Sequence, residues 1–152
     1  MFFGILFVRS ILNIFLTFSK MNNKLLLIDD DEIASFLVGK LVKKNPVIDE
    51  FVVQENGLDA MNYLHSLDDN DLFPSVILVD LDMPVMDGYE FLHLYQKTFW
   101  KKHPKTKVVM VTSSRRKVDW EKALEYKCVE DCLYKPINQN FLTDIFEKTA
   151  VA

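Results

Sequence analysis

Short strand-like runs of apolar residues alternate with helical patterns along most of this chain, and this alternation constrains the fold more than any other feature. The runs lie at residues 24–28, 51–53, 76–79, 107–111 and 131–134. Continuous apolar runs are typical of strands covered on both faces, as in parallel sheets. Five such units in about 130 residues predict an α/β fold, a doubly wound parallel sheet with right-handed crossovers and helices on both faces.

The segments between the runs carry apolar residues at helical spacing. Ile33, Phe36, Leu37 and Leu41 follow the period of a helix with one apolar face. The pairs Asn56-Gly57 and Asp87-Gly88 predict turns that open the second and third helices. The later apolar positions with this spacing are Ala60, Met61, Leu64 and Leu67; Phe91, Leu92, Tyr95 and Phe99; Trp120, Ala123 and Leu124; and Phe141, Leu142 and Ile145.

Charge and cysteine content exclude several classes of function. The chain has 18 basic and 22 acidic side chains, so it lacks the basic surplus of a protein that tracks nucleic-acid phosphates, and we expect no direct nucleic-acid partner. Cys128 and Cys132 cannot form a disulfide framework, and without a second pair they form no zinc site. We expect them to be buried thiols in a reducing, cytoplasmic environment.

Residues 1–20 form an apolar leader without acidic residues. Arg9, near its middle, disfavours a membrane span, and the leader has neither the basic start nor the cleavage site of a secretory signal. Met21 directly precedes the polar segment before the first strand. Two interpretations stay open: the leader belongs to a mis-called upstream start, or it forms an extra helix that packs or lies on a membrane surface. We expect residues 21–152 to form a single domain.

Polar side chains follow the predicted strands at the edge where ligands bind in doubly wound sheets. With the common strand order 2-1-3-4-5, the loops after strands 1, 3, 4 and 5 open on one pocket. These residues are Asp29, Asp30 and Asp31 after the first strand, Asp80 and Asp82 after the third, Thr112 and Ser113 after the fourth, and Lys135 after the fifth.

This set of residues favours phosphoryl chemistry on an aspartate. Crowded carboxylates need a compensating cation, and a set of oxygen donors without histidine or thiol suits Mg²⁺. Lys135 supplies a positive charge and Thr112 a hydroxyl donor, both of which a phosphoryl oxygen can use. Asp31 and Glu32 are expected instead to stabilise the start of the first helix.

Four motifs in the same order and spacing resemble the signatures of response-regulator receiver domains of two-component signalling. They are LLLIDDDE at 25–32, VILVDLDMPVMDGYEFL at 76–92, VVMVTSS at 108–114 and LYKP at 133–136. The resemblance extends from Lys24 to about Lys148 and implies a flavodoxin-like fold. By position, the resemblance implies that Asp80 is the phosphoacceptor and that Thr112 and Lys135 hold phosphoryl oxygens. It also implies that Mg²⁺ is ligated directly by Asp30 and Asp80, through a water by Asp29, and by the backbone carbonyl of Asp82.

The resemblance also implies a stand-alone response regulator without an output domain and without enzymatic turnover of other substrates. Its phosphoryl donor would be a sensor histidine kinase or a histidine phosphotransfer protein, and its output an unidentified protein target. A dimer through the face of helix 4, strand 5 and helix 5 is a further implication. The family's Lys-Pro peptide is cis, here Lys135-Pro136. One departure is Cys132, where the family usually has an aromatic switch residue.

The sequence leaves two alternative functions open. Asp80 and Asp82 also resemble the nucleophile motif of haloacid-dehalogenase-type phosphatases, although Pro84 stands where that family has a hydroxyl or small apolar residue. The other alternative is a receiver-like interaction module that is never phosphorylated, which the set of Asp30, Asp80, Thr112 and Lys135 disfavours.

Overall fold

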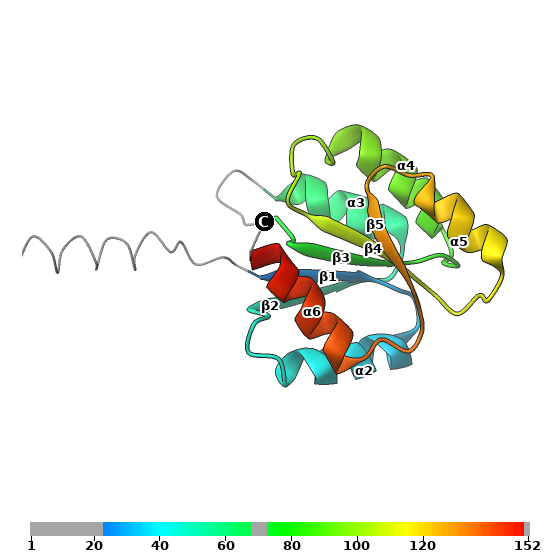
Figure 1. Ribbon diagram of the computed structural model, residues 1–152. Coiled ribbons are helices and arrows are strands. Elements are labelled where there is room, and N and C mark those ends of the chain that lie inside the picture. Colours follow the sequence, from blue (N-terminus) through cyan, green and yellow to red (C-terminus); the bar gives the residue numbers. More distant parts are fainter. Residues whose placement is uncertain (1–22, 68–72, 151–152) are drawn as a thin grey trace, which may run out of the picture.

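The computed structural model describes residues 23–67 and 73–150, which form a five-stranded parallel sheet between two layers of helices (Figure 1). The sheet order is β2-β1-β3-β4-β5, as predicted. The strands are β1 (Lys24–Ile28), β2 (Glu50–Gln54), β3 (Val76–Asp80), β4 (Lys107–Thr112) and β5 (Val129–Tyr134); the helices are α2 (Glu32–Lys43), α3 (Gly57–Ser66), α4 (Gly88–Thr98), α5 (Lys117–Leu124) and α6 (Gln139–Ala150).

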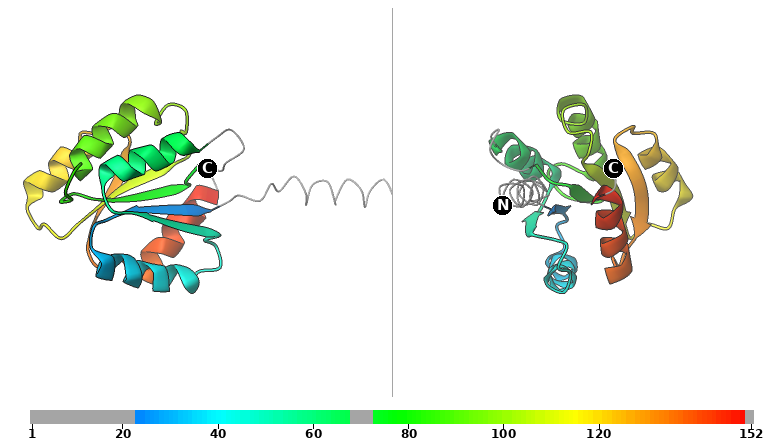
Figure 2. Two further views of the ribbon diagram at one scale, coloured as in Figure 1. Left: turned by 180° about the vertical axis from the view of Figure 1, so that it is seen from behind. Right: turned by 60° about the vertical axis from the view of Figure 1, so that its left-hand side comes forward.

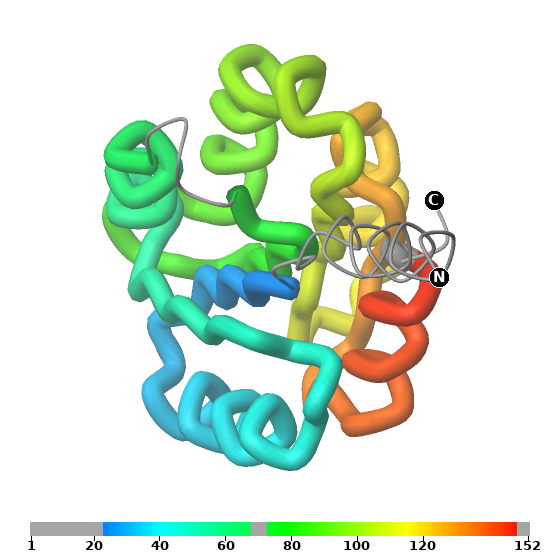
Figure 3. Tube along the Cα trace, turned by 90° about the vertical axis from the view of Figure 1, so that its left-hand side faces the viewer, coloured from blue at the N-terminus to red at the C-terminus, as the bar shows by residue number. Residues whose placement is uncertain are grey.

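Helices α2 and α6 cover one face of the sheet, and α3, α4 and α5 cover the other (Figure 2). Figure 3 looks along the strands and shows the sheet between these layers. Every residue of β1 and β3 is buried, and successive side chains point to opposite faces. Leu25 and Leu27 therefore pack with α2 and α6, whereas Leu26 and Ile28 pack with α3 and α4.

Side-chain caps fix where most of the helices begin. The Asp31 carboxylate accepts hydrogen bonds from the backbone N–H groups of Ile33 and Ala34 at the start of α2, which confirms its predicted role. Asn56 caps α3, and Asp87 caps α4 in a capping box. Helix α5 differs, because its N-cap residue, Arg116, makes no side-chain cap hydrogen bond.

The periodicity of α2 predicts the helix correctly, but three of its four predicted apolar positions do not face the core. Ile33, Phe36 and Leu37 are 72%, 62% and 51% exposed, and the buried residue of α2 is Val38. The core side of the helix is completed by partly buried Leu41 and Val42. Helix α2 therefore presents an apolar surface outward.

The predicted apolar leader, residues 1–20, lies outside the described residues. Among the helices that the structure describes, none is long and apolar enough to cross a membrane.

Candidate functional site

The carboxyl ends of β1, β3 and β5 bring two carboxylates and one lysine into direct contact. Asp29 follows β1, Asp80 ends β3, and Lys135 follows β5. The Lys135 Nζ lies 2.7 Å from Asp29 Oδ2 and 3.2 Å from Asp80 Oδ2. Both carboxylates are buried, and the lysine side chain is 19% exposed. One ammonium group thus bridges two buried acids at the edge predicted to bind ligand.

Asp30 completes an acidic cluster with these two residues. One carboxylate oxygen each from Asp29, Asp30 and Asp80 can be chosen so that all three lie within 4.8 Å of one another. Asp30 is exposed and opens the cluster to solvent. Three hard oxygen donors with one open side fit a divalent cation such as Mg²⁺, which keeps several of its waters when bound to protein. Asp82 lies two residues beyond Asp80 in the β3–α4 loop and is exposed.

The electrostatics of the cluster follow from its burial. Burial raises the pKa of Asp80 to about 6, the Lys135 ammonium opposes this rise, and the Asp29 charge adds to it. Burial alone would lower the pKa of Lys135, but its hydrogen bond to Asp29 and the Asp80 charge leave that pKa raised. A second cation near the three acids would relieve the repulsion between the Asp29 and Asp80 carboxylates.

The backbone around Asp80 is held in place by the start of α4. The Leu81 N–H donates to Asp80 Oδ1 over 2.8 Å, and the Gly88 N–H donates to the Leu81 carbonyl over 2.9 Å. A Cβ at Gly88 would fall inside contact distance of the Asp80 carbonyl oxygen. Glycine at 88 therefore allows the close approach that sets the loop after the acidic strand end.

Thr112 lies at the end of β4, buried beside Lys135. Its carbonyl accepts a hydrogen bond from the Lys135 N–H over 2.9 Å, and its Oγ1 accepts one from the Ser114 N–H over 3.0 Å. The structure therefore brings Asp29, Asp30, Asp80 and Lys135 together and joins Thr112 to Lys135 through the backbone. The Lys135-Pro136 peptide bond is cis, as the resemblance implied.

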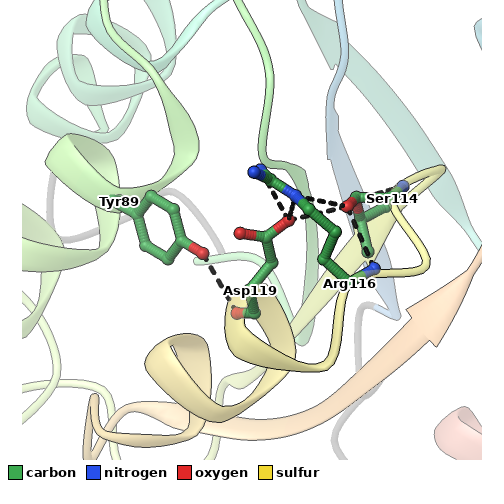
Figure 4. A network of polar contacts seen from close by, with 5 residues as sticks. Tyr89, Ser114, Arg116 and Asp119 are labelled. Carbon is green, nitrogen blue, oxygen red and sulfur yellow. Dashed lines mark hydrogen bonds and ion pairs between the residues drawn. The ribbon is translucent and has the colours of Figure 1, made fainter.

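Ser114 belongs to a polar network that ties the β4–α5 loop to α5 and α4 (Figure 4). The Ser114 hydroxyl donates to Asp119 Oδ2 over 2.6 Å, and Arg116 Nε and Nη2 each lie 2.9 Å from the same oxygen. The Tyr89 hydroxyl donates to the Asp119 carbonyl over 3.0 Å. The Ser114 hydrogen bond and the Arg116 guanidinium hold the pKa of Asp119 below its usual value.

Asp119 and Tyr89 are not among the site residues predicted from the sequence. Arg116 lies in a short basic run with Arg115 and Lys117, and Asp119 is an ordinary acid of a first helical turn. The one local sign of their contact is the three-residue spacing of Arg116 and Asp119, which is common on solvated helices. Nothing in the sequence places Tyr89 thirty residues away beside them.

Cys132 is buried in a small cluster with Leu81, Met110 and Ala123. Burial raises the pKa of this thiol to about 11, so it is a protonated packing residue. Tyr89 and Trp120 are the aromatic side chains that pack against this cluster, and the Trp120 ring centroid lies 4.7 Å from that of Tyr134. Cys128 is buried as well, as predicted for both cysteines.

An apolar groove of about 620 Å³ runs from the acidic cluster along α2. Its walls include Ile33 and Leu37 of α2 and Pro136 and Ile137 beyond β5, and Asp29 and Lys135 lie at its polar end. The exposed apolar surface of α2 is therefore continuous with the candidate site.

Comparison with known proteins agrees with this geometry. A family model described as the response regulator receiver domain matches residues 25–147. The sensor histidine kinase CheAY of Helicobacter pylori is 30% identical over 124 residues, and the response regulator Rcp1 of Synechocystis is 33% identical over 98 residues. These matches cover 82% and 62% of this chain, which spans 14% of CheAY and 65% of Rcp1.

Solved structures of response regulators share the fold. A two-component response regulator from Cytophaga hutchinsonii superimposes with a TM-score of 0.77 at 29% identity, covering 85% of this chain and 97% of that one. The Mn²⁺-bound form of response regulator Rcp1 superimposes with a TM-score of 0.65 at 29% identity, covering 84% of this chain and 88% of that one.

Proposed function

This chain belongs to the response regulator receiver domain family, and from that premise we propose that Asp80 accepts a phosphoryl group from a phosphohistidine of a partner protein. The contact of one lysine with two buried carboxylates beside an exposed third acid carries the proposal. Asp80 is the acid that Lys135, the Leu81 N–H and the close approach of Gly88 hold in place together.

In the proposed reaction, the Asp80 carboxylate attacks the phosphorus atom in line with the bond to the histidine nitrogen. That bond breaks, its electron pair stays on the imidazole, and an acyl phosphate forms on Asp80. Lys135 and the Thr112 hydroxyl hold phosphoryl oxygens as negative charge shifts onto them. Water later attacks the acyl phosphate, which releases phosphate and restores the carboxylate.

Asp30 and Asp80 would hold Mg²⁺ directly, Asp29 through a water, and Asp82 through its backbone carbonyl. A bound Mg²⁺ would supply positive charge that compensates the phosphoryl oxygens. The acidic cluster with its open side supports this assignment, and the relative Rcp1 has been solved in an Mn²⁺-bound form.

The proposed donor is a sensor histidine kinase or a histidine phosphotransfer protein, in line with the naming of the relative CheAY as a sensor histidine kinase. It would contact the apolar surface of α2, which leads directly into the site. The output would pass to a protein target in the cytoplasm. The face of α5, β5 and α6 offers exposed Tyr134 and Val118 for that target or for a second copy of the chain.

The experiment is to incubate the full chain with Mg²⁺ and acetyl phosphate and to measure its intact mass. We expect the mass of one phosphoryl group to be added to the unmodified chain and to Asp144→Asn, a control at an exposed position of α6. Asp80→Asn should gain no mass. Phosphate that survives Asp80→Asn, or none on the unmodified chain, would contradict the proposal, and turnover of simple phosphate esters would favour a phosphatase.

A further inference from the structure

We propose that Asp119 is a positioning residue of the phosphoacceptor pocket, which acts on Thr112 through Ser114. This inference rests on the function proposed for Asp80. It concerns the network of Tyr89, Ser114, Arg116 and Asp119 (Figure 4), which contacts the hydroxyl of Thr112 through the Ser114 backbone N–H.

The hydroxyl of Thr112 has one proton to donate and two lone pairs that accept. One lone pair accepts from the Ser114 N–H, and the residue is 1% exposed, so water has little access to the group. Because the Ser114 N–H occupies one side of the Thr112 oxygen, the Thr112 hydroxyl proton is available to donate to an oxygen in the pocket. The position of the Ser114 backbone therefore sets the direction in which Thr112 donates.

Ser114 is itself fixed by Asp119. The 2.6 Å bond from the Ser114 hydroxyl to Asp119 Oδ2 is short for a hydroxyl donor and has an ionised acceptor. Two nitrogens of Arg116 contact the same oxygen at 2.9 Å. The Asp119 side chain is 12% exposed, whereas that of Arg116 is 72% exposed. The arginine thus covers a largely buried carboxylate and keeps it directed at Ser114.

Tyr89 links the network back to the phosphoacceptor. Its hydroxyl donates to the Asp119 carbonyl, and it follows Gly88, which packs directly against the Asp80 carbonyl. The contacts therefore run from Asp80 through the start of α4 to Asp119 and return to the pocket at Thr112. Helix α5 has no side-chain cap of its own, so the beginning of this helix depends on the same contacts.

A role limited to stabilising α5 would give the same contacts, and a double-mutant cycle separates the two roles. The rate of phosphorylation by acetyl phosphate with Mg²⁺ is measured for the full chain, Asp119→Ala, Thr112→Ala and the double variant. We expect Asp119→Ala to slow phosphorylation about tenfold through misplacement of a catalytic group. We expect no further slowing when Asp119→Ala is added to Thr112→Ala.

Two variants serve as controls. Asp119→Asn keeps an oxygen that accepts from Ser114 and should recover most of the rate. Glu121→Ala removes an exposed ion pair with Lys117 in the same helix and should leave the rate unchanged. If Asp119→Ala slows phosphorylation equally in the unmodified chain and in Thr112→Ala, the positioning role is overturned and the proposed function stands. An unchanged rate in Asp119→Ala has the same meaning. No phosphorylation of the unmodified chain overturns both.

Discussion

The acidic side and the hydroxyl side of the pocket are built in different ways. On the acidic side, Asp29 and Asp80 are attached to β1 and β3, whose residues are all buried. On the hydroxyl side, Ser114 lies in a loop before a helix without a side-chain cap and is held by Asp119. The acidic side is thus positioned by the core of the sheet, and the hydroxyl side by a polar network near the surface.

This difference separates what is general in the site from what is particular to this chain. Strand ends in a doubly wound sheet converge whatever the loop sequences are, so the acidic cluster follows from the fold. The hydroxyl side depends on the hydrogen bonds and ion contacts that join Ser114, Arg116 and Asp119. Substitutions on the acidic side should therefore slow phosphorylation more than substitutions on the hydroxyl side do.

Among substitutions that keep Asp80, the largest effect is expected from Lys135→Met. The change removes the cation that bridges Asp29 and Asp80 and the donor proposed to hold a phosphoryl oxygen. Loss of one such donor costs about 100- to 1,000-fold in rate. The measurement is the initial rate of phosphorylation by acetyl phosphate at saturating Mg²⁺. A rate for Lys135→Met within about twofold of the unmodified chain would mean that the lysine is structural. The control is Lys127→Met, at an exposed position.

Gly88→Ala tests how tightly the acidic side is packed. The new methyl group would overlap the Asp80 carbonyl oxygen, and overpacking of this kind costs about 1–3 kcal/mol. We expect the urea midpoint to fall and phosphorylation to slow. In the matched control, Gly39→Ala, the new Cβ meets two ring carbons of Phe51, at 3.4 and 3.9 Å, and helix propensity should raise stability by about 0.5–1 kcal/mol. Equal effects of the two substitutions would contradict the account.

Asp30→Asn separates metal binding from stability. Asp30 is exposed, so unfolding without Mg²⁺ should change by less than about 0.5 kcal/mol. Saturating Mg²⁺ should stabilise the unmodified chain, because a ligand that binds only the folded state shifts unfolding by mass action. This stabilisation should be reduced in Asp30→Asn, as followed by urea titration at several Mg²⁺ concentrations. The same Mg²⁺ dependence in both proteins would place the ion elsewhere.

Arg116→Ala should have the smallest effect. Its ion pair with Asp119 is largely solvated on the arginine side, so it contributes about 1 kcal/mol or less to stability. We expect phosphorylation to slow about twofold to threefold, since the Ser114–Asp119 hydrogen bond remains. A larger loss of phosphorylation rate than in Asp119→Ala would contradict the proposal that Arg116 acts only by supporting Asp119.

The same contrast explains what the sequence could predict. The strands, their order and the residues at their ends follow from apolar runs and from the topology of parallel sheets, so the acidic cluster was predictable. The buried face of α2 was not predictable, because Ile33, Phe36 and Leu37 have the spacing of a core face yet are exposed. Spacing defines a helical face but not what covers it. The contact of Tyr89 with Asp119 joins two helices through a carbonyl, and no residue pattern encodes it.

The most direct test of Asp80 as the phosphoacceptor is a crystal structure of the chain with Mg²⁺ and beryllofluoride, which mimics a phosphoryl group on aspartate. We predict beryllium bonded to an Asp80 carboxylate oxygen, the ion in contact with Asp30 and Asp80, and fluorine atoms in contact with Lys135 and Thr112. Beryllofluoride on another residue, or its absence from a fully folded chain at saturating concentration, would contradict the assignment of Asp80 as the phosphoacceptor.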